Sequence, residues 1–248
     1  MIRPTRTWRA AATVAAAALV LSACGNDSAS PEAGSGDGGG DASNEPAAKS
    51  KGDGTLTVGS LLPATGDLAF LGPPEFAAVD LAVKEINAAG GVLGKNVAKE
   101  QADSGDGTPN IAPAETDKLL NAGADVVVGA ASSSVSLSVI DKIVGSGTVQ
   151  ISPANTSTAF DTYDDKGLYF RTAPSDVLQG AVLANMILAD GSQNTAIMAR
   201  QDSYGEALTN QVEKVLTAQG GNLVAKVLYD ANAATFSAEV SAIAGKKP

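Results

Sequence analysis

The sequence predicts an α/β fold with a parallel sheet, and two observations indicate it. Short apolar runs alternate with amphipathic helical patterns along residues 55–248, and glycine pairs or polar turns separate them. The run at 125–129, Asp-Val-Val-Val-Gly, is continuously apolar and precedes a helical pattern. Because such runs are typical of strands that are buried on both faces, we expect helices to flank the sheet.

The first half of this region contains four expected strands. They are placed at 55–62, 96–101, 125–129 and 148–152. A helix is expected to begin at Pro73-Pro74, since proline suits a first turn, and to end at Gly90-Gly91. A second helix is expected at 111–121, and a third carries the apolar stripe of Val135, Val139 and Ile143.

The pattern then continues with strands at 168–171, 195–198 and 223–229. A helix opens at Asp176, and its apolar side is expected to contain Leu178, Val182 and Met186. Ser203 and Glu206 have the spacing of a capping box at the start of the next helix. A last helix is expected at 235–244.

Composition excludes several classes of function. The 248 residues include 27 acids and 17 bases, a formal net charge of −10, so nucleic acid is not expected as a partner. The sequence has no histidine and one cysteine, which excludes histidine-dependent triads, histidine-ligated zinc and an intramolecular disulfide. The motifs of phosphate-binding loops and of serine hydrolases are absent, so no catalytic residue, cofactor or metal is expected. An enzyme that uses carboxylates alone stays open as an alternative.

Residues 1–23 are predicted to be a secretory signal peptide. A basic start precedes an apolar run at 10–21, which is too short to span a membrane. Cys24 follows Leu21-Ser22-Ala23, a pattern that resembles the lipobox of bacterial lipoproteins and implies a lipid on Cys24. An ordinary signal peptide with a chance cysteine is the alternative. Residues 24–54 are rich in Gly, Ser and Asp and are expected to form a disordered tether.

Three segments suggest ligand binding. Ala131, Ser132 and Ser133 follow a strand and open a helix, where free N–H groups and the helix dipole suit a carboxylate; a simple helix cap is the alternative. The carbonyl of Ala154 and the hydroxyl of Thr156 follow the next strand and could face an ammonium group, unless this is only a surface turn.

The third segment contains Tyr204, in the first turn of its expected helix. Its ring and hydroxyl could reach across a cleft, or it could simply pack at the helix start. These two interpretations stay open on the residues alone.

Taken in order, these segments resemble the leucine/branched-chain amino-acid-binding family, the type I periplasmic substrate-binding proteins of ABC importers. The residues that carry the resemblance are the opening VGSLLPATG at 58–66, FAAVDLAVKEINAAGG at 76–91, and the segments at 129–134, 152–156, 170–172 and 204–206. It implies two lobes, each with a parallel sheet flanked by helices, that close on a ligand. The lobes are expected at 55–174 and 175–248.

The resemblance also implies roles for individual residues. Ser133, with Ala131 and Ser132 beside it, is expected to bind the ligand α-carboxylate. Ala154 and Thr156 are expected to bind its α-ammonium group and to share the carboxylate. In addition, Asp176 matches an acid that lines the family's site, and Tyr204 matches a tyrosine from the second lobe.

Three departures from the family pattern affect these expectations. Leu71, with Phe70 adjacent, falls where the family has an aromatic residue, and Asn155 stands where leucine binders carry a small apolar residue. Both changes could alter the preference for a ligand side chain. Family members also continue beyond the equivalent of Pro248, so the second lobe is expected to be incomplete, lacking a further tyrosine and the acid that completes the ammonium site.

The first hypothesis for function is therefore an extracytoplasmic, lipid-anchored solute-binding protein. It would deliver a branched-chain amino acid or a similar small polar solute to the permease of an ABC importer, and would catalyse no reaction. A sensor of the same fold, which signals to a membrane receptor or kinase, is the second hypothesis. The extracytoplasmic carboxylate enzyme is the third.

Overall fold

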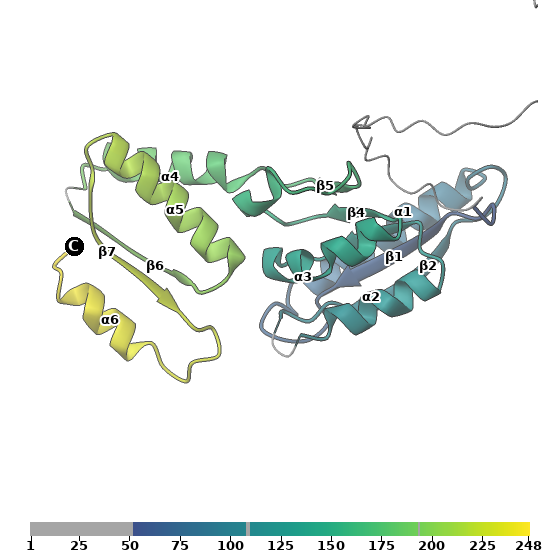
Figure 1. Ribbon diagram of the computed structural model, residues 1–248, viewed down its shortest axis with the longest axis horizontal. Helices are drawn as coiled ribbons and strands as arrows, with labels where there is room; N and C mark the ends of the chain where they lie inside the picture. Colours follow the sequence, from purple (N-terminus) through teal and green to yellow (C-terminus); the bar gives the residue numbers. More distant parts are fainter. Residues whose placement is uncertain (1–51, 108–109, 193) are drawn as a thin grey trace, which may run out of the picture. The chain divides into compact units, whose positions relative to one another are not determined.

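The computed structural model describes residues 52–107, 110–192 and 194–248 (Figure 1). The predicted signal peptide, Cys24 and the tether up to residue 51 lie outside the described residues. No helix in the described ranges is long and apolar enough to cross a membrane.

Strands and helices alternate along the described chain, as the sequence predicts. The strands are β1 (Thr57–Leu62), β2 (Ala98–Asp103), β3 (Val126–Gly129), β4 (Val149–Ser152), β5 (Tyr169–Arg171), β6 (Asn194–Arg200) and β7 (Asn222–Tyr229). The helices are α1 (Gly72–Ala88), α2 (Ala112–Asn121), α3 (Ser133–Gly145), α4 (Asp176–Ala189), α5 (Ser203–Ala218) and α6 (Ser237–Ala244), with a 3₁₀ turn η1 at Thr158–Phe160.

The strands form two sheets. The first has the order β2-β1-β3-β4-β5 and the second pairs β6 with β7, and every pairing between these strands is parallel. This arrangement confirms the expected α/β class with parallel sheets and flanking helices. Because parallel strands need a crossover between them, each βαβ unit places the loop after a strand at the same edge of the sheet.

Alternate residues of the central strands pack on opposite faces of the first sheet. Leu61 and Val127 are fully buried on the face that α2 and α3 cover, together with Val139 of α3. Val58 and Leu62 pack on the other face against Val79 and its neighbours in α1. The core therefore fixes the position of each strand's carboxyl end, where the loops begin.

Two features of the second half of the chain could not be read from the sequence pattern. The expected apolar side of α4 is exposed, with Leu178, Val182 and Met186 each 50–59% accessible. The side that α4 buries contains Gly180 and Ala184 instead, because a Cβ at position 180 would lie 2.5 Å from the Cβ of Gln211 in α5. Small residues thus let α4 and α5 approach closely, a contact that an apolar periodicity does not reveal.

The N-terminal cap of α5 also differs from the expected capping box of Ser203 and Glu206. The cap is Asp202, whose Oδ1 accepts hydrogen bonds from the backbone N–H groups of Tyr204 (3.1 Å) and Gly205 (2.8 Å). A carboxylate is a strong cap and gains from the helix dipole, which explains why it replaces the serine one position later.

Candidate functional site

The candidate site lies at the carboxyl ends of the strands of the first sheet. The loops after β1, β3 and β4 all begin at this edge, and the segment at 129–134 and the segment at 152–156 are two of them. Open parallel sheets bind ligands at this edge because loops there are free to vary while the strands stay fixed. The fold therefore brings together the segments that the sequence analysis singled out.

A cavity of about 290 Å³ occupies this position. It is lined by Leu68, Leu71, Ala131, Ser132, Ser133, Ala154, Thr156, Gln179, Arg200, Asp202 and Tyr204. One wall comes from the first sheet's loops and the N-terminus of α3, and the other comes from α4, β6 and α5. A cavity of this size suits a small organic solute.

The serines at the start of α3 differ in how their side chains are used. Ser132 is the N-cap, and its Oγ accepts from the backbone N–H of Val135 at 3.4 Å. Ser133 is 97% buried, and its Oγ accepts from the backbone N–H of Ser157 at 3.4 Å. The Ser133 hydroxyl keeps its own proton to donate, so an anion at the positive end of α3 can receive it.

Thr156 places an unused hydroxyl in the cavity wall. Its Oγ1 is buried and has no hydrogen-bond partner among the described residues. The backbone carbonyl of Thr156 accepts from the N–H of Asp176 at 2.8 Å, which holds the loop against the start of α4. Since buried hydroxyl groups in proteins are normally paired, a hydroxyl that lies near the Asp176 carboxyl without forming a hydrogen bond of good geometry indicates a position that a ligand can fill.

Asp176 lies directly behind Thr156 and is fully buried. Neither carboxylate oxygen has a hydrogen-bond partner in the described part of the chain, although the Thr156 hydroxyl lies near it. Burial raises the pKa of the Asp176 carboxyl, and the Thr156 hydroxyl and the charge of Arg171 offset this only in part. Asp176 does not line the cavity and lies behind Thr156.

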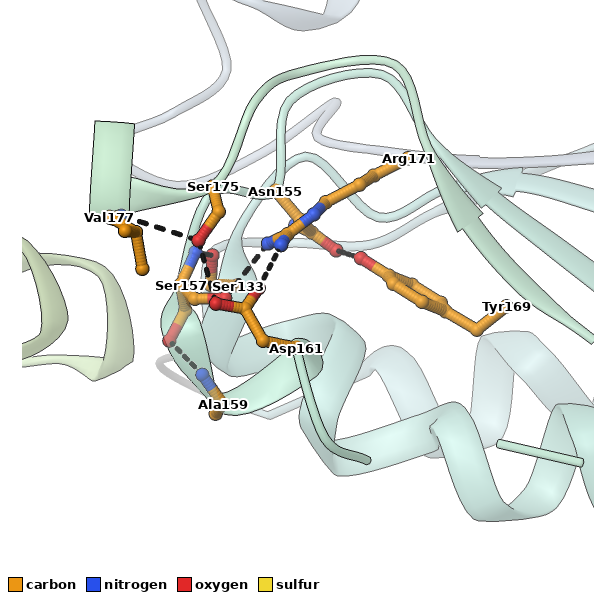
Figure 2. Close-up of polar contacts among 9 residues, drawn as sticks. All are labelled: Ser133, Asn155, Ser157, Ala159, Asp161, Tyr169, Arg171, Ser175 and Val177. Atoms are coloured by element: carbon orange, nitrogen blue, oxygen red, sulfur yellow. Dashed lines mark hydrogen bonds and ion pairs between the residues drawn. The ribbon is translucent and has the colours of Figure 1, made fainter. Parts of the chain in front are cut away.

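Asn155 supports the site from beneath. Its Nδ2 donates to the carbonyls of Ala130 (3.1 Å) and Ala131 (2.9 Å). Its Oδ1 accepts from the Tyr169 hydroxyl at 2.9 Å, as Figure 2 shows. The side chain is fully buried, which joins the loop after β4 to the loop after β3. Asn155 was predicted to contact the ligand, but the structure places it outside the cavity lining.

A second polar cluster fixes the crossover between β5 and α4. Arg171 donates to the carbonyl of Ser157 at 2.8 Å and forms an ion pair with Asp161, whose other oxygen accepts from the Ser175 hydroxyl at 2.8 Å (Figure 2). Ser175 is in turn the N-cap of α4. These contacts hold the first turn of α4, and with it Asp176, against the loop that carries Thr156.

The opposite wall contains most of the remaining polar groups. The Nε2 of Gln179 donates to the Tyr204 hydroxyl at 3.4 Å, and the Nε of Arg200 lies 2.8 Å from Oδ2 of Asp202. The backbone N–H of Ser203 donates to the Ser134 hydroxyl at 2.9 Å, which connects the starts of α5 and α3.

Seven of the ten predicted ligand residues line the cavity. They are Leu71, Ala131, Ser132, Ser133, Ala154, Thr156 and Tyr204. Asn155 and Asp176 lie behind them, and Phe70 is 71% exposed beside Leu71 without lining the cavity. Leu68, Gln179, Arg200 and Asp202 also line the cavity and were not predicted. Arg200 and Asp202 could have been suggested by their position just before Tyr204, whereas no signal in the sequence indicated Leu68 or Gln179.

No group of three or more acidic, cysteine or histidine side chains within the described ranges is placed to hold a metal ion. The cavity offers hydroxyls, backbone groups, one ion pair and aliphatic side chains. Such a lining can bind and orient a small zwitterion or carboxylate, with the aliphatic part of the ligand against Leu68 and Leu71.

Residues 55–248 match the family described as periplasmic binding protein. The chain is 32% identical over 179 residues to the Leu/Ile/Val-binding protein BraC3 of Rhizobium johnstonii, covering 71% of this chain and 47% of the relative. It is 34% identical over 162 residues to the Leu/Ile/Val/Thr-binding protein of Salmonella typhimurium, covering 64% and 44%. A third relative, the chemotactic signal transduction system substrate-binding protein BasB of Halobacterium salinarum, is 29% identical over 186 residues, covering 70% and 43%. The chain spans about half the length of these relatives.

Solved structures agree on the fold. The leucine-binding protein LivK of Thermotoga maritima matches with a TM-score of 0.69 at 20% identity, over 78% of this chain and 54% of that one. The branched-chain amino acid transporter substrate-binding protein LivJ of Streptococcus pneumoniae, in complex with isoleucine, matches with a TM-score of 0.67 at 24% identity, over 77% and 54%.

Proposed function

The chain belongs to the periplasmic-binding-protein family, and from that premise we propose that it binds an amino acid in the cavity between α3 and α5 and delivers it to an ABC importer. The observation that carries the proposal is the pairing of a helix N-terminus with an unused, buried Thr156 hydroxyl in one small cavity. The family consists of binding proteins rather than enzymes, which agrees with a cavity that has no recognisable catalytic group.

The proposed ligand position follows from the chemistry of the lining. The α-carboxylate lies at the start of α3, where the Ser133 hydroxyl and backbone N–H groups donate to it. The α-ammonium group lies against the carbonyl of Ala154 and the hydroxyl of Thr156, with the buried charge of Asp176 behind them. An aliphatic side chain then packs on Leu68 and Leu71, as the relatives named for leucine, isoleucine and valine suggest.

Thermal unfolding of the full chain with and without leucine, isoleucine, valine and other amino acids tests this function. A ligand present at 100 times its Kd stabilises the folded state by about 2.7 kcal/mol. For a domain of this size the unfolding temperature should rise by about 5–10 °C. If no amino acid shifts the transition, the proposed function is wrong.

The site assignment is tested by Thr156→Ala, with Thr217→Ala as the matched control. Thr217 is exposed on α5, and its hydroxyl donates to the Glu213 carbonyl. Removing the Thr156 hydroxyl should weaken binding by about 1–3 kcal/mol, because it leaves the ligand's charged group without a partner. Equal affinity in both variants would show that the ligand binds elsewhere.

We also propose that the protein is extracytoplasmic and held to the membrane by a lipid on Cys24. The support is the lipobox-like pattern before Cys24 together with the family's periplasmic role. Cys24→Ser should release the protein from the membrane fraction into the medium or periplasm, and the mature wild-type N-terminus should carry a lipid by mass spectrometry. An unmodified Cys24 in wild type would contradict the anchor.

A sensory role is the second candidate, because one relative is named for a chemotactic signal transduction system. The two functions differ in what a gene deletion removes. Loss of radiolabelled amino-acid uptake supports delivery to an importer, whereas normal uptake with loss of the behavioural response to the same amino acid supports a sensor.

A further inference from the structure

We propose that Arg200 is a further ligand-binding residue, whose guanidinium binds the ligand carboxylate from the side opposite the N-terminus of α3. This inference rests on the proposed function and deepens it, since it makes a carboxylate a required part of the ligand. Arg200 was not among the residues predicted to bind the ligand.

Arg200 is the last residue of β6 and lines the same cavity as Ser132 and Ser133. Among the described residues of that lining it is the single cation. Its side chain is 23% accessible, so it is largely shielded from solvent, and a charge-assisted hydrogen bond there is stronger than one at an open surface.

The side chain is fixed through one nitrogen only. Its Nε lies 2.8 Å from Oδ2 of Asp202, while Oδ1 of Asp202 is held by the N–H groups of Tyr204 and Gly205. Asp202 is therefore a positioning residue that orients the guanidinium. Across residues 52–107, 110–192 and 194–248, the terminal Nη groups of Arg200 have no hydrogen bond or ion pair, so the two that form a carboxylate-binding fork are available.

The start of α3 and Arg200 line the same two cavities. The hydrogen bond of 2.9 Å from the Ser203 N–H to the Ser134 hydroxyl joins the first turns of α5 and α3. Arg200 and Ser134 also line one further polar cavity of about 350 Å³. A carboxylate between the two elements would meet helix N–H groups and serine hydroxyls on one side and the guanidinium on the other.

The charges around Arg200 direct an anion to the ligand cavity and not to the polar cavity beside it. Asp106, Glu206 and Asp230 line that second cavity together with Arg200 and Asp202. Hydrogen bonds from Asn232 and, less strongly, the charge of Arg200 lower the pKa of the Asp230 carboxyl, so it is ionised at neutral pH. An anion on that side would be repelled by several carboxylates, whereas the ligand cavity adds the positive end of α3.

The experiment compares amino acids with their amides, which lack the carboxylate. Calorimetry on the full chain gives the Kd of leucine, isoleucine and valine and of the three corresponding amides, for wild type, Arg200→Gln and Lys226→Gln. Lys226 is the matched control, because it is an exposed cation of β7 that contacts Asn210 and Glu213 away from the cavity. Arg200→Lys, which keeps a positive charge but loses the fork, is a second variant that does not depend on Arg200→Gln folding.

Arg200→Gln should weaken binding of the acid by about 10- to 100-fold and change the affinity for the amide by less than about threefold. Arg200→Lys should lose part of the preference for the acid, and Lys226→Gln should leave it unchanged. The inference is overturned if Arg200→Gln weakens acid and amide equally, or if wild type binds both equally well; the proposed function then stands. If wild type binds neither, the proposed function has failed as well.

Discussion

Replacing Asp176 with asparagine should stabilise the unliganded protein and at the same time weaken its binding of an ammonium-bearing ligand. Asp176 is fully buried, and neither of its oxygens has a hydrogen-bond partner within the described residues. An unsatisfied buried charge costs about 1–3 kcal/mol or more. The first turn of α4 returns about 0.3–1 kcal/mol of this through the helix dipole. The net gain from Asp176→Asn is therefore about 1–2 kcal/mol, or about 2–8 °C in unfolding temperature.

The pH dependence of unfolding tests whether ionised Asp176 destabilises the folded state. Burial raises the pKa of Asp176 in the folded state above its unfolded value, so folding favours the protonated form. Wild type and Asp176→Asn should be closest in stability well below pH 4, where the carboxyl is protonated in both the folded and the unfolded state. The wild type should then lose stability relative to the variant as pH rises from about 4 through the raised folded pKa.

Thermal melts between pH 4 and pH 8 measure this difference, with Asp164→Asn as the control, since Asp164 is exposed in the loop before β5. Calorimetry with the amino acid that binds best should show a weaker Kd for Asp176→Asn, because the negative charge behind Thr156 is gone. A variant that is less stable than wild type at pH 7, or one that binds the ligand as tightly, would refute the argument that this charge is kept for the ligand.

Three further predictions concern the framework of the site. Gly205→Ala should destabilise the fold by about 1–3 kcal/mol in urea unfolding, because its Cβ would lie 2.0 Å from the carbonyl oxygen of Arg200; an unchanged midpoint would contradict this packing. Leu216→Ala should lower the free energy of unfolding by about 2–5 kcal/mol in the same measurement, since Leu216 of α5 is fully buried in a cluster with Ala184 and Val212. A loss below about 1 kcal/mol would show that this cluster is not close-packed. Asn155→Ala should lower stability by about 1–3 kcal/mol and also weaken ligand binding, because it leaves the carbonyls of Ala130 and Ala131 without a donor; normal binding would show that the loops hold their positions without it.

Most elements of the fold could be predicted because each one leaves a local pattern. The valine run of β3 and the apolar spacing of α1 are properties of short windows, and the structure places both within a few residues of expectation. The predicted N-cap of α5 was wrong by one residue. Asp202 and Ser203 are both residue types that cap helices well, and only the backbone geometry decides between them. The buried side of α4 could not be predicted for a different reason, since contact with α5 decides it.

The candidate site could be predicted in part for the same reason. Ser133 and Thr156 follow strands of one sheet, so topology alone brings them to one edge. Arg200 and Gln179 belong to the opposite wall, and their position depends on how α4 and β6 meet the first sheet's loops. That arrangement is made by contacts distant in sequence, such as the one between Ser134 and Ser203, and no local pattern encodes it.

The polar groups near the cavity fall into two sets, and the difference between them is the strongest physical argument for where the ligand binds. Asn155 has three hydrogen bonds from its side chain, and Ser152 both donates to Ala130 and accepts from the loop after β4, so these groups are satisfied without a ligand. The hydroxyl oxygen of Thr156 and the carboxylate oxygens of Asp176 are also buried, but they have no hydrogen bond of good geometry among the described residues. A protein that can satisfy one set so completely has no structural need to leave the other unpaired. A charged ligand that pairs with the Thr156 hydroxyl and places a positive charge in front of Asp176 would recover stability that the unliganded chain gives up.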